Sequence, residues 1–472
     1  KTKSYANYRD DWGGVPEYKP DANGKIDNTD FFGGNLKGIT KKLTYLKNLG
    51  VTHVYLTPIF EAHSNHKYDP GNYMRVDSDF GTIDDLKDLI KKANKRGIKI
   101  ILDGVFSHTG DDSIYFNKYG NYDSTGAYQS VKSPYYSWYK FRHWNNDYEC
   151  RYNIDIMPDT DVSNPMYDEF VTGQEGIIRY WTRMGLGGWR LDVCERLTDK
   201  FIEHCAHAVK TENPDAVVYG EVFMDASNAI VDNSRRSFLI DGKLDSVTNY
   251  PFKEDILNYV RCGDSDRLNN TVGFVINNYP KHAVDSLMNV LDNHDTARLM
   301  TVLGDNGNVA SKDDKATATV KNKDEAKLLV KLAAALQYTL PGVPCVYYGD
   351  EVGMEGFEDP FNRRCYPWGE GDKDLLKWYK KLGAVRTNER EIFAHGHYCG
   401  VDTEHGVMFF KRKAGDEVVY VVVNNSGSEY VPNLPKDDYT DLMTYKPFKG
   451  KVADKDVAII KSTKKTTFPE KP

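Results

Sequence analysis

GGWRLDV, residues 187–193, follows a helical run that ends at Met184-Gly185. Side chains alternate between the two faces of a strand, so a strand here would bury the apolar residues on one face and turn Arg190 and Asp192 to the other. Buried charges are costly unless they are paired. Taken alone, the stretch therefore favours a structural ion pair over a functional site.

Helices and strands are predicted to alternate along most of the chain on either side of this stretch. Strands separated by helices predict a parallel sheet, and this many units predict a (β/α)8 TIM barrel. An eighth strand lies either upstream or hidden in the loop-like residues 1–35. The seven predicted strands are residues 51–59, 98–105, 188–193, 216–222, 246–250, 287–291 and 343–348. The predicted helices are residues 36–50, 83–96, 174–184, 198–211, 252–260, 323–339 and 373–386.

Two interruptions divide this pattern into domains. The segment after His108 is too long for an ordinary loop between strand and helix and predicts an insert domain. After about Ala394 short alternating strands predict an antiparallel β-sandwich. The predicted domains are a first barrel part at 1–107, the insert at 108–173, the barrel remainder at 174–393, the sandwich at 394–461 and a tail or linker at 462–472.

Composition narrows the classes of ligand. No apolar run approaches the ~20 residues that cross a bilayer, and the first residues, Lys1-Thr2-Lys3-Ser4, are not a signal peptide. The net charge of -7, with lysine and aspartate mixed along the chain, argues against nucleic acid. The 7 cysteines form no CxxC pair, so neither a zinc site nor a dense disulfide framework is predicted. We expect a neutral or weakly polar ligand.

Charged and polar residues follow several of the predicted strands. In a parallel barrel the functional residues lie at the C-terminal ends of strands. Each such residue alone could be a helix cap or a surface charge, but together they direct carboxylates and histidines to one rim. The strand ends in question are Asp103 to His108, Arg190 to Asp192, Glu221 and Asp292 to Asp295.

Other chemistries lack their sequence signals. A catalytic divalent metal usually needs closely spaced ligands such as HExxH, and serine hydrolysis of this fold class uses a GxSxG elbow. Neither motif is present, and no glycine-rich phosphate loop follows a strand. What remains is acid–base and nucleophilic catalysis by carboxylates, which are the catalytic groups of glycoside hydrolysis.

With these motifs in view, the chain resembles the α-amylase family, glycoside hydrolase family 13. Residues 65–69 (NHKYD) and 103–106 (DGVF) are most similar to its neopullulanase, cyclomaltodextrinase and maltogenic amylase branch. The motifs occur in the order and spacing of the family. They are residues 103–108, 188–196, 220–222, 291–298 and 341–351.

The resemblance implies three catalytic carboxylates. Asp192 would be the nucleophile, Glu221 the general acid/base and Asp295 the stabiliser of the transition state. Arg190 lies two residues before Asp192 and would keep that carboxylate ionised, while a dry site would favour the protonated form of Glu221.

The resemblance also implies residues that hold the substrate. His108 and His294 would donate hydrogen bonds to sugar hydroxyls, and Tyr68 would stack on the same ring. The remaining members of the implied substrate-binding set are Arg190, Asp359 and Arg363, the last two holding the next sugar. Asp103 is expected to orient Arg190 rather than touch substrate.

Two departures from the family pattern limit what the resemblance carries. Ser107 stands where the family usually has an asparagine that ligates calcium, which puts a structural calcium in doubt. The chemistry itself requires no cofactor, and metal ligands are not identified. After the nucleophile, Glu195-Arg196 replaces the Asn-Glu that is usual in the branch. Preference for pullulan or cyclodextrin is therefore not carried over.

The sequence thus predicts a retaining hydrolase that cleaves α-1,4 bonds of starch, maltooligosaccharides or related glucans through a covalent glycosyl-enzyme. The alternatives are an α-1,6-acting or pullulan-acting member, a transglycosylating member, and a non-catalytic carbohydrate-binding protein. The preferred glucan, endo or exo action and the oligomeric state stay open. Because polymeric starch is met outside cells and the tail resembles a linker to further modules, an extracellular location is favoured over a cytoplasmic one.

Overall fold

The computed structural model describes residues 3–22, 26 and 28–466. The chain divides into two compact units, one of residues 1–12 and 17–247 and the other of residues 13–16 and 248–472. The domain boundaries, the closed barrel and the separate insert domain stay predictions. Residues 23–25 and 27 of the predicted N-terminal loop and residues 467–472 of the predicted tail lie outside the described part.

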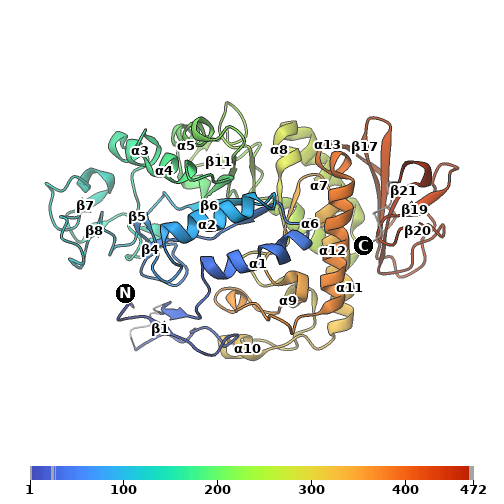
Figure 1. The fold of residues 1–472 in the computed structure, drawn as a ribbon, viewed down its shortest axis with the longest axis horizontal. Helices are drawn as coiled ribbons and strands as arrows, with labels where there is room; N and C mark the ends of the chain where they lie inside the picture. Colours follow the sequence, from blue (N-terminus) through green and yellow to red (C-terminus); the bar gives the residue numbers. More distant parts are fainter. Residues whose placement is uncertain (1–2, 23–25, 27, 467–472) are drawn as a thin grey trace. The chain divides into compact units, whose positions relative to one another are not determined.

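The first unit is built around a five-stranded parallel sheet. All seven strands predicted from the sequence are present in the chain, five of them here. Helices α1 (Leu36–Asn48) and α2 (Ile83–Asn94) lie side by side in this unit (Figure 1). The strand order is β13 (Ser246–Val247), β10 (Val217–Gly220), β9 (Gly188–Leu191), β6 (Lys99–Gly104) and β3 (His53–Tyr55).

The GGWRLDV stretch forms β9 in the middle of this sheet, and its apolar face is buried as predicted. Trp189 is fully buried. Its indole N–H donates to Thr182 Oγ1 at 2.9 Å, and its ring centroid lies 6.0 Å from that of Phe106. A large aromatic side chain in the core and a satisfied polar tip fix the strand in place. Arg190 and Asp192 are therefore held on the opposite face.

Between β6 and β9 the chain forms short elements that the sequence analysis did not resolve. The hairpin of β7 (Phe141–His143) and β8 (Asp147–Tyr148) is followed by α3 (Pro165–Thr172) and α4 (Ile177–Thr182). The predicted helix 174–184 is thus shorter, and α3 was missed. Asn164 caps α3 by accepting from the backbone N–H of Met166 and Tyr167, with Pro165 in the first turn. Helix α5 (Asp199–Glu212) matches its prediction within a residue.

The N-terminal residues contain strands where a loop was predicted. Strand β1 (Asn7–Tyr8) pairs in parallel with β2 (Asp30–Phe31), a contact across more than twenty residues that no local pattern announces. The hairpin of β4 (Phe60–Ala62) and β5 (Pro70–Val76) follows β3.

The loop of that hairpin is anchored by a buried lysine. Lys67 Nζ lies 2.9 Å from Asp77 Oδ2 and donates to the carbonyl of Ala62 at 3.1 Å, and the side chains of Lys67 and Asp77 are both 0% exposed. Burial lowers the pKa of Lys67 to about 8. Lys3 Nζ binds the same carboxylate at 2.7 Å. Lys67 therefore ties the loop that carries Tyr68 to the end of β5.

The second unit contains the other two predicted strands. Strand β14 (Met288–Val290) pairs in parallel with β15 (Val343–Cys345), and Thr248 forms a parallel bridge with Met288. Helices α11 (Lys323–Thr339) and α12 (Lys373–Asn388) lie side by side (Figure 1) and match their predictions.

Helix α6 (Tyr250–Cys262) starts two residues earlier than predicted and shortens the predicted strand 246–250. The reason is that the Asn249 side chain caps it by accepting from Phe252 N. The helices that the sequence analysis missed are α7 (Ser265–Asn278), α8 (Lys281–Ser286), α9 (Leu299–Leu303), α10 (Lys312–Thr317) and α13 (Arg390–His395).

The C-terminal strands form one antiparallel sheet among the described residues, not the two sheets that the predicted sandwich requires. Residues 462–465, assigned above to the tail, belong to this fold, because Ser462 pairs with Tyr439 and residues 463–465 form a 3-10 turn. The sheet order is β16 (His397–Asp402), β17 (Val407–Ala414), β18 (Glu417–Asn424), β21 (Asp456–Ser462), β19 (Tyr439–Asp441) and β20 (Lys446–Pro447).

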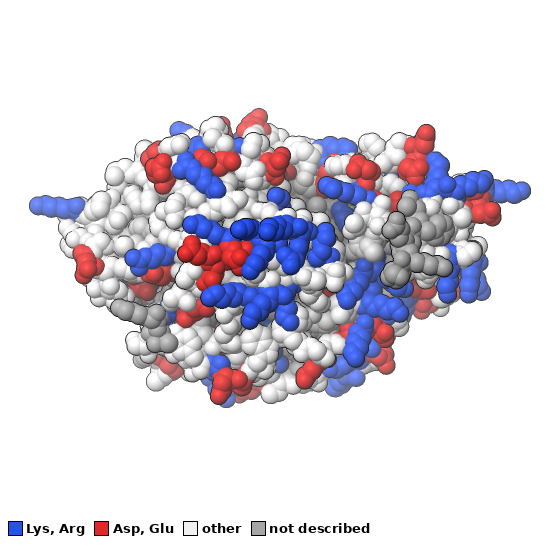
Figure 2. All heavy atoms as spheres, in the orientation of Figure 1, with Lys and Arg blue, Asp and Glu red and all other residues white. Residues whose placement is uncertain are grey.

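The surface carries charges of both signs. Lysines gather over α1 and α2 with acidic residues beside them (Figure 2). Within the described residues, no helix has the length and apolar character needed to cross a membrane.

Replacing Lys67 with methionine is expected to lower the free energy of unfolding by about 3 kcal/mol, because it leaves Asp77 buried with a single cation. Urea denaturation measures the change. Lys87→Met is the control, since Lys87 is 54% exposed and its ion pair should contribute less than about 0.5 kcal/mol. Equal losses in the two variants would contradict the anchoring role of Lys67.

Candidate active site

One guanidinium joins three carboxylates at the strand ends of the first unit. In the sheet register Arg190 of β9 stands opposite Asp103 of β6. Arg190 Nη1 lies 2.8 Å from Asp103 Oδ1 and 2.6 Å from Asp192 Oδ1, and Nη2 lies 2.5 Å from Glu221 Oε1. All four side chains are at most 8% exposed. The structure thus brings together Arg190, Asp192 and Glu221 from two adjacent strands.

Asp103 is held from its other side by two phenols. Tyr55 and Tyr68 donate to Asp103 Oδ2 at 2.6 and 2.7 Å. Burial raises the pKa of both phenols well above the ordinary value, so both remain donors. The predicted contact of Asp103 with Arg190 is present. No role was predicted for Tyr55, because its only signal was a phenol inside a predicted apolar strand.

The turn after β9 brings the backbone to Glu221. Val193 has φ 42° and ψ 64°, a left-handed conformation that is strained for a β-branched residue. Its N–H donates to Glu221 Oε2 at 3.0 Å, and the N–H of Cys194 donates to the Glu221 carbonyl at 3.0 Å. The strained turn therefore fixes both the side chain and the backbone of Glu221.

Three carboxylates around one guanidinium retain a proton. Burial raises the pKa of Asp192 to about 8; the charge of Arg190 opposes this shift, while the negative charges of Glu221 and Asp103 add to it. Burial also raises the pKa of Asp103. The sequence predicted that Asp103 and Asp192 contact Arg190, and the structure adds Glu221 as a third acid on the same guanidinium. The cluster as a whole holds a proton near neutral pH.

His108 is neutral and engaged. Burial lowers the pKa of His108 to about 4. Its Nε2 lies 2.7 Å from the carbonyl oxygen of Tyr68, which can only accept, so Nε2 carries the proton. Ser107 Oγ lies 3.1 Å from Nδ1 of His108. His108 therefore fixes the backbone of Tyr68, whose ring is half-buried.

Ser107, which stands at the position of the family's usual calcium ligand, is buried and lies beside His108. Its hydroxyl is used by His108, and its carbonyl accepts from Thr160 N at 3.0 Å. Throughout the described ranges, no group of three or more His, Cys, Asp or Glu side chains is arranged to hold a metal ion.

The second unit gathers the remaining predicted residues at the loop after β14. Arg363 Nε lies 2.8 Å from Asp359 Oδ1, and Nη2 lies 3.4 Å from Asp295 Oδ1. Arg363 also donates to the carbonyl of His294 at 2.9 Å, and His294 Nε2 lies 3.4 Å from Asp295 Oδ2. Asp295 is exposed, whereas His294 is buried. Four predicted residues thus share one local network.

A buried arginine supports this loop from behind. Arg298 donates to the carbonyls of Asn362 and Tyr348 at 2.8 and 2.7 Å, and its guanidinium lies 4.4 Å from the Tyr347 ring centroid. Asp350, at 3.5 Å from Arg298 Nη1, has its pKa raised well above the ordinary value by burial. Arg298 therefore links the loop after β14 to the segment after β15. Arg298 and Asp350 both lie in motifs that resemble those of the family, but no role was predicted for either residue.

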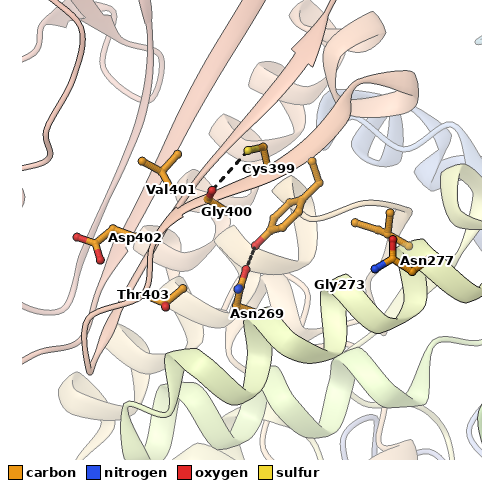
Figure 3. Close-up of a pocket in the computed structure, with 10 residues that line it drawn as sticks. Asn269, Gly273, Asn277, Cys399, Gly400, Val401, Asp402 and Thr403 are labelled. Carbon is orange, nitrogen blue, oxygen red and sulfur yellow. Dashed lines mark hydrogen bonds between the residues drawn. The ribbon is translucent and has the colours of Figure 1, made fainter.

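The second unit also contains a cavity of about 410 Å³ between α7 and β16 (Figure 3). Among its lining residues, Tyr398 donates to Asn269 Oδ1 at 2.8 Å, and Asp402 is the only carboxylate. Large pockets are the usual first hypothesis for an active site. This cavity lacks paired carboxylates and contains none of the predicted residues, so the strand-end clusters are the better candidate.

Comparison with known proteins identifies the family. The model of the alpha-amylase catalytic domain matches residues 19–404. Neopullulanase 2 of Thermoactinomyces vulgaris is 32% identical over 456 residues, which cover 93% of this chain and 71% of that protein. The chain therefore belongs to the alpha-amylase family of glycoside hydrolases, and its resemblance to the neopullulanase and cyclomaltodextrinase branch is confirmed.

Two further comparisons describe how far the similarity extends. An amylopullulanase of Thermoanaerobacterium saccharolyticum is 36% identical over 461 residues, which cover 88% of this chain and 34% of that protein. The chain thus spans about a third of its length. The ligand-free cyclic alpha-maltosyl-(1→6)-maltose hydrolase of Arthrobacter globiformis matches with a TM-score of 0.78 at 26% identity, covering 96% of this chain and 92% of that one.

Replacing Arg190 with methionine is expected to lower the free energy of unfolding by about 3 to 5 kcal/mol at pH 8, because three buried carboxylates lose their cation. The loss should be smaller at pH 5. At that pH Asp103 and Asp192, whose pKa values burial raises and the Arg190 charge lowers, take up protons in the folded variant.

Urea denaturation at pH 5 and pH 8 measures the loss in the free energy of unfolding at each pH. Arg142→Met is the control, since Arg142 is 60% exposed and pairs with Asp147 on the surface. A loss that is equal at pH 5 and pH 8 would contradict the proposed charge balance.

Proposed function

We propose that this chain is a retaining hydrolase that cleaves α-1,4-glucosidic bonds of starch, maltooligosaccharides or related α-glucans. The observation that carries the proposal is the position of Asp192 and Glu221 on the two arms of the Arg190 guanidinium. Retaining glycosidases need their two carboxyl groups about 5 Å apart, whereas inverting enzymes need room for a water between them. Two carboxylates bridged by one guanidinium favour the closer spacing.

The first step uses the proton that the carboxylate cluster retains. With the proton on Glu221, the Asp192 carboxylate attacks the anomeric carbon while Glu221 protonates the leaving glycosidic oxygen. The bond from the anomeric carbon to that oxygen breaks, and an ester bond to Asp192 forms.

In the second step Glu221, now ionised, takes a proton from water, and the resulting hydroxide cleaves the ester. The sugar leaves with its original configuration, and the proton is back on Glu221.

The neighbouring residues support these roles. The Val193 N–H holds the Glu221 carboxyl group, and the phenols of Tyr55 and Tyr68 hold Asp103 so that Arg190 is oriented. In this proposal Tyr68 stacks on the sugar. His108 would exchange the Tyr68 carbonyl for a sugar hydroxyl to act as a donor.

The roles proposed for residues of the second unit come from the resemblance to the family. We assign Asp295 to stabilising the positive charge of the transition state, His294 to a sugar hydroxyl, and Asp359 with Arg363 to the next sugar. Their shared network supports this assignment, because Arg363 contacts both acids. The (β/α)8 barrel predicted from the sequence belongs to the same proposal.

A second candidate is cleavage of α-1,6 bonds or of pullulan. It is favoured by the names of similar proteins, which include amylopullulanase, neopullulanase and a hydrolase of a cyclic (1→6)-linked maltose. The departure at Glu195-Arg196 from the branch motif leaves the choice of bond to experiment.

Asp192→Asn is expected to lower kcat on maltoheptaose by at least about a thousandfold, because the amide cannot form the glycosyl ester. Release of reducing sugar gives the rate. Asp241→Asn is the control, since that side chain is 74% exposed in the same unit. Activity of Asp192→Asn within tenfold of the parent would show that the nucleophile is wrongly assigned.

The products from amylose and pullulan distinguish the two candidate bonds. We expect maltooligosaccharides from amylose, formed first as α-anomers, and we expect any product of pullulan to keep its α-1,6 bonds. Chromatography identifies the products, and proton NMR of fresh products gives the anomer. Maltotriose as the sole pullulan product would favour α-1,6 cleavage, and β-anomers would exclude the retaining mechanism.

A further inference from the structure

We propose that Tyr152 is a stacking platform for a glucose unit of the substrate, beyond the sugar at the cleaved bond. This inference rests on the proposed function and adds a binding residue to it. Tyr152 lies in the first unit, in the short turn η2 (Arg151–Asn153), and no motif of the sequence analysis included it.

The segment that carries Tyr152 is joined to the strand end that carries His108 through residues 158–159, which pair with both. Cys150 forms an antiparallel bridge with Pro158, and His108 forms one with Asp159. The N–H of Thr109 donates to the carbonyl of Pro158 at 3.1 Å. The charge of Arg151 is among those that act on the pKa of His108, after its burial. The turn therefore borders the candidate site of the first unit.

Most of the Tyr152 residue is exposed to solvent. Its side chain is 66% exposed, whereas Arg151 beside it is 3% exposed. The Arg151 guanidinium lies 4.2 Å from the ring centroid and donates through Nη2 to the Tyr152 hydroxyl at 3.1 Å. A cation against a ring and a bond to its hydroxyl fix the side chain. A fixed aromatic ring loses little entropy when a ligand stacks on it.

The backbone at Tyr152 has a strained conformation. Tyr152 and Asn153 have φ 51° and 59°, two consecutive non-glycine residues in the left-handed region. Such strain persists only where the surroundings impose it, and it concentrates at ligand sites. The ring is held by the Arg151 contacts and not by burial in the core.

The chemistry of the ring indicates a sugar. Exposed single aromatic residues are common and need no function. Here the ring is fixed, strained into place and joined to the border of a carbohydrate site. A glucose unit presents an apolar face that stacks on an aromatic ring, and it needs no charge to do so. The exposed side chains of Ile154 and Ile156 extend the same turn with apolar surface.

Tyr152→Ala is expected to lower kcat/KM on maltoheptaose about tenfold while that on maltotriose stays within twofold, because the longer chain alone reaches a distal platform. Tyr152→Phe keeps the ring and should stay within threefold of the parent on both substrates. Phe274→Ala controls for loss of an exposed aromatic, since Phe274 is 46% exposed on α7 of the second unit. Thermal unfolding checks that each variant folds.

The outcomes separate this inference from the proposed function. A parent without activity on any α-glucan would overturn the proposed function. In that case electrophoresis of the native protein in a gel that contains amylopectin still tests the platform. The retardation of the protein by amylopectin should fall for Tyr152→Ala and persist for Tyr152→Phe. Equal losses on maltotriose and maltoheptaose, no loss on either, or equal retardation of the two Tyr152 variants would overturn the platform itself.

Discussion

The candidate site depends on one interaction, the sharing of the Arg190 guanidinium by Asp103, Asp192 and Glu221. A planar guanidinium can direct its N–H groups at several acceptors at once, which the ammonium group of a lysine cannot do in the same fixed geometry. The sheet makes this sharing feasible, because parallel pairing of β6, β9 and β10 brings three strand ends together. The charge balance follows from this sharing, because burial and the two neighbouring acids raise the pKa of Asp192 while the charge of Arg190 opposes the shift.

Much of the fold was predictable because the predicted strands and helices are local patterns. All seven strands and helices such as α5 and α11 follow from apolar runs and from helical periodicity. The missed helices had readable signals, for example Asn164-Pro165 before α3. By contrast, the pairing of β1 with β2, and the joining of the C-terminal strands into one sheet, depend on contacts between distant residues. A local pattern does not contain them.

The site shows the same division between local and distant information. Asp192, Glu221 and Arg190 were found because charges at strand ends stand out from apolar surroundings. Tyr55 was missed because a phenol in a predicted apolar strand is consistent with ordinary packing. The contact of Arg190 with Glu221 was not predicted, for a related reason. Spacing along the chain reveals the pair of Arg190 and Asp192, but Glu221 comes from a neighbouring strand.

The departure at Glu195 from the branch motif has a structural consequence that bears on substrate choice. Its carboxylate accepts from the N–H of Phe223 at 2.8 Å, and Arg236 donates to its carbonyl at 3.0 Å. Glu195 therefore joins the turn after Asp192 to the segment after Glu221. An uncharged residue at this position would make a weaker bond to that N–H. At this position the chain therefore holds the two segments together through a charged hydrogen-bond acceptor.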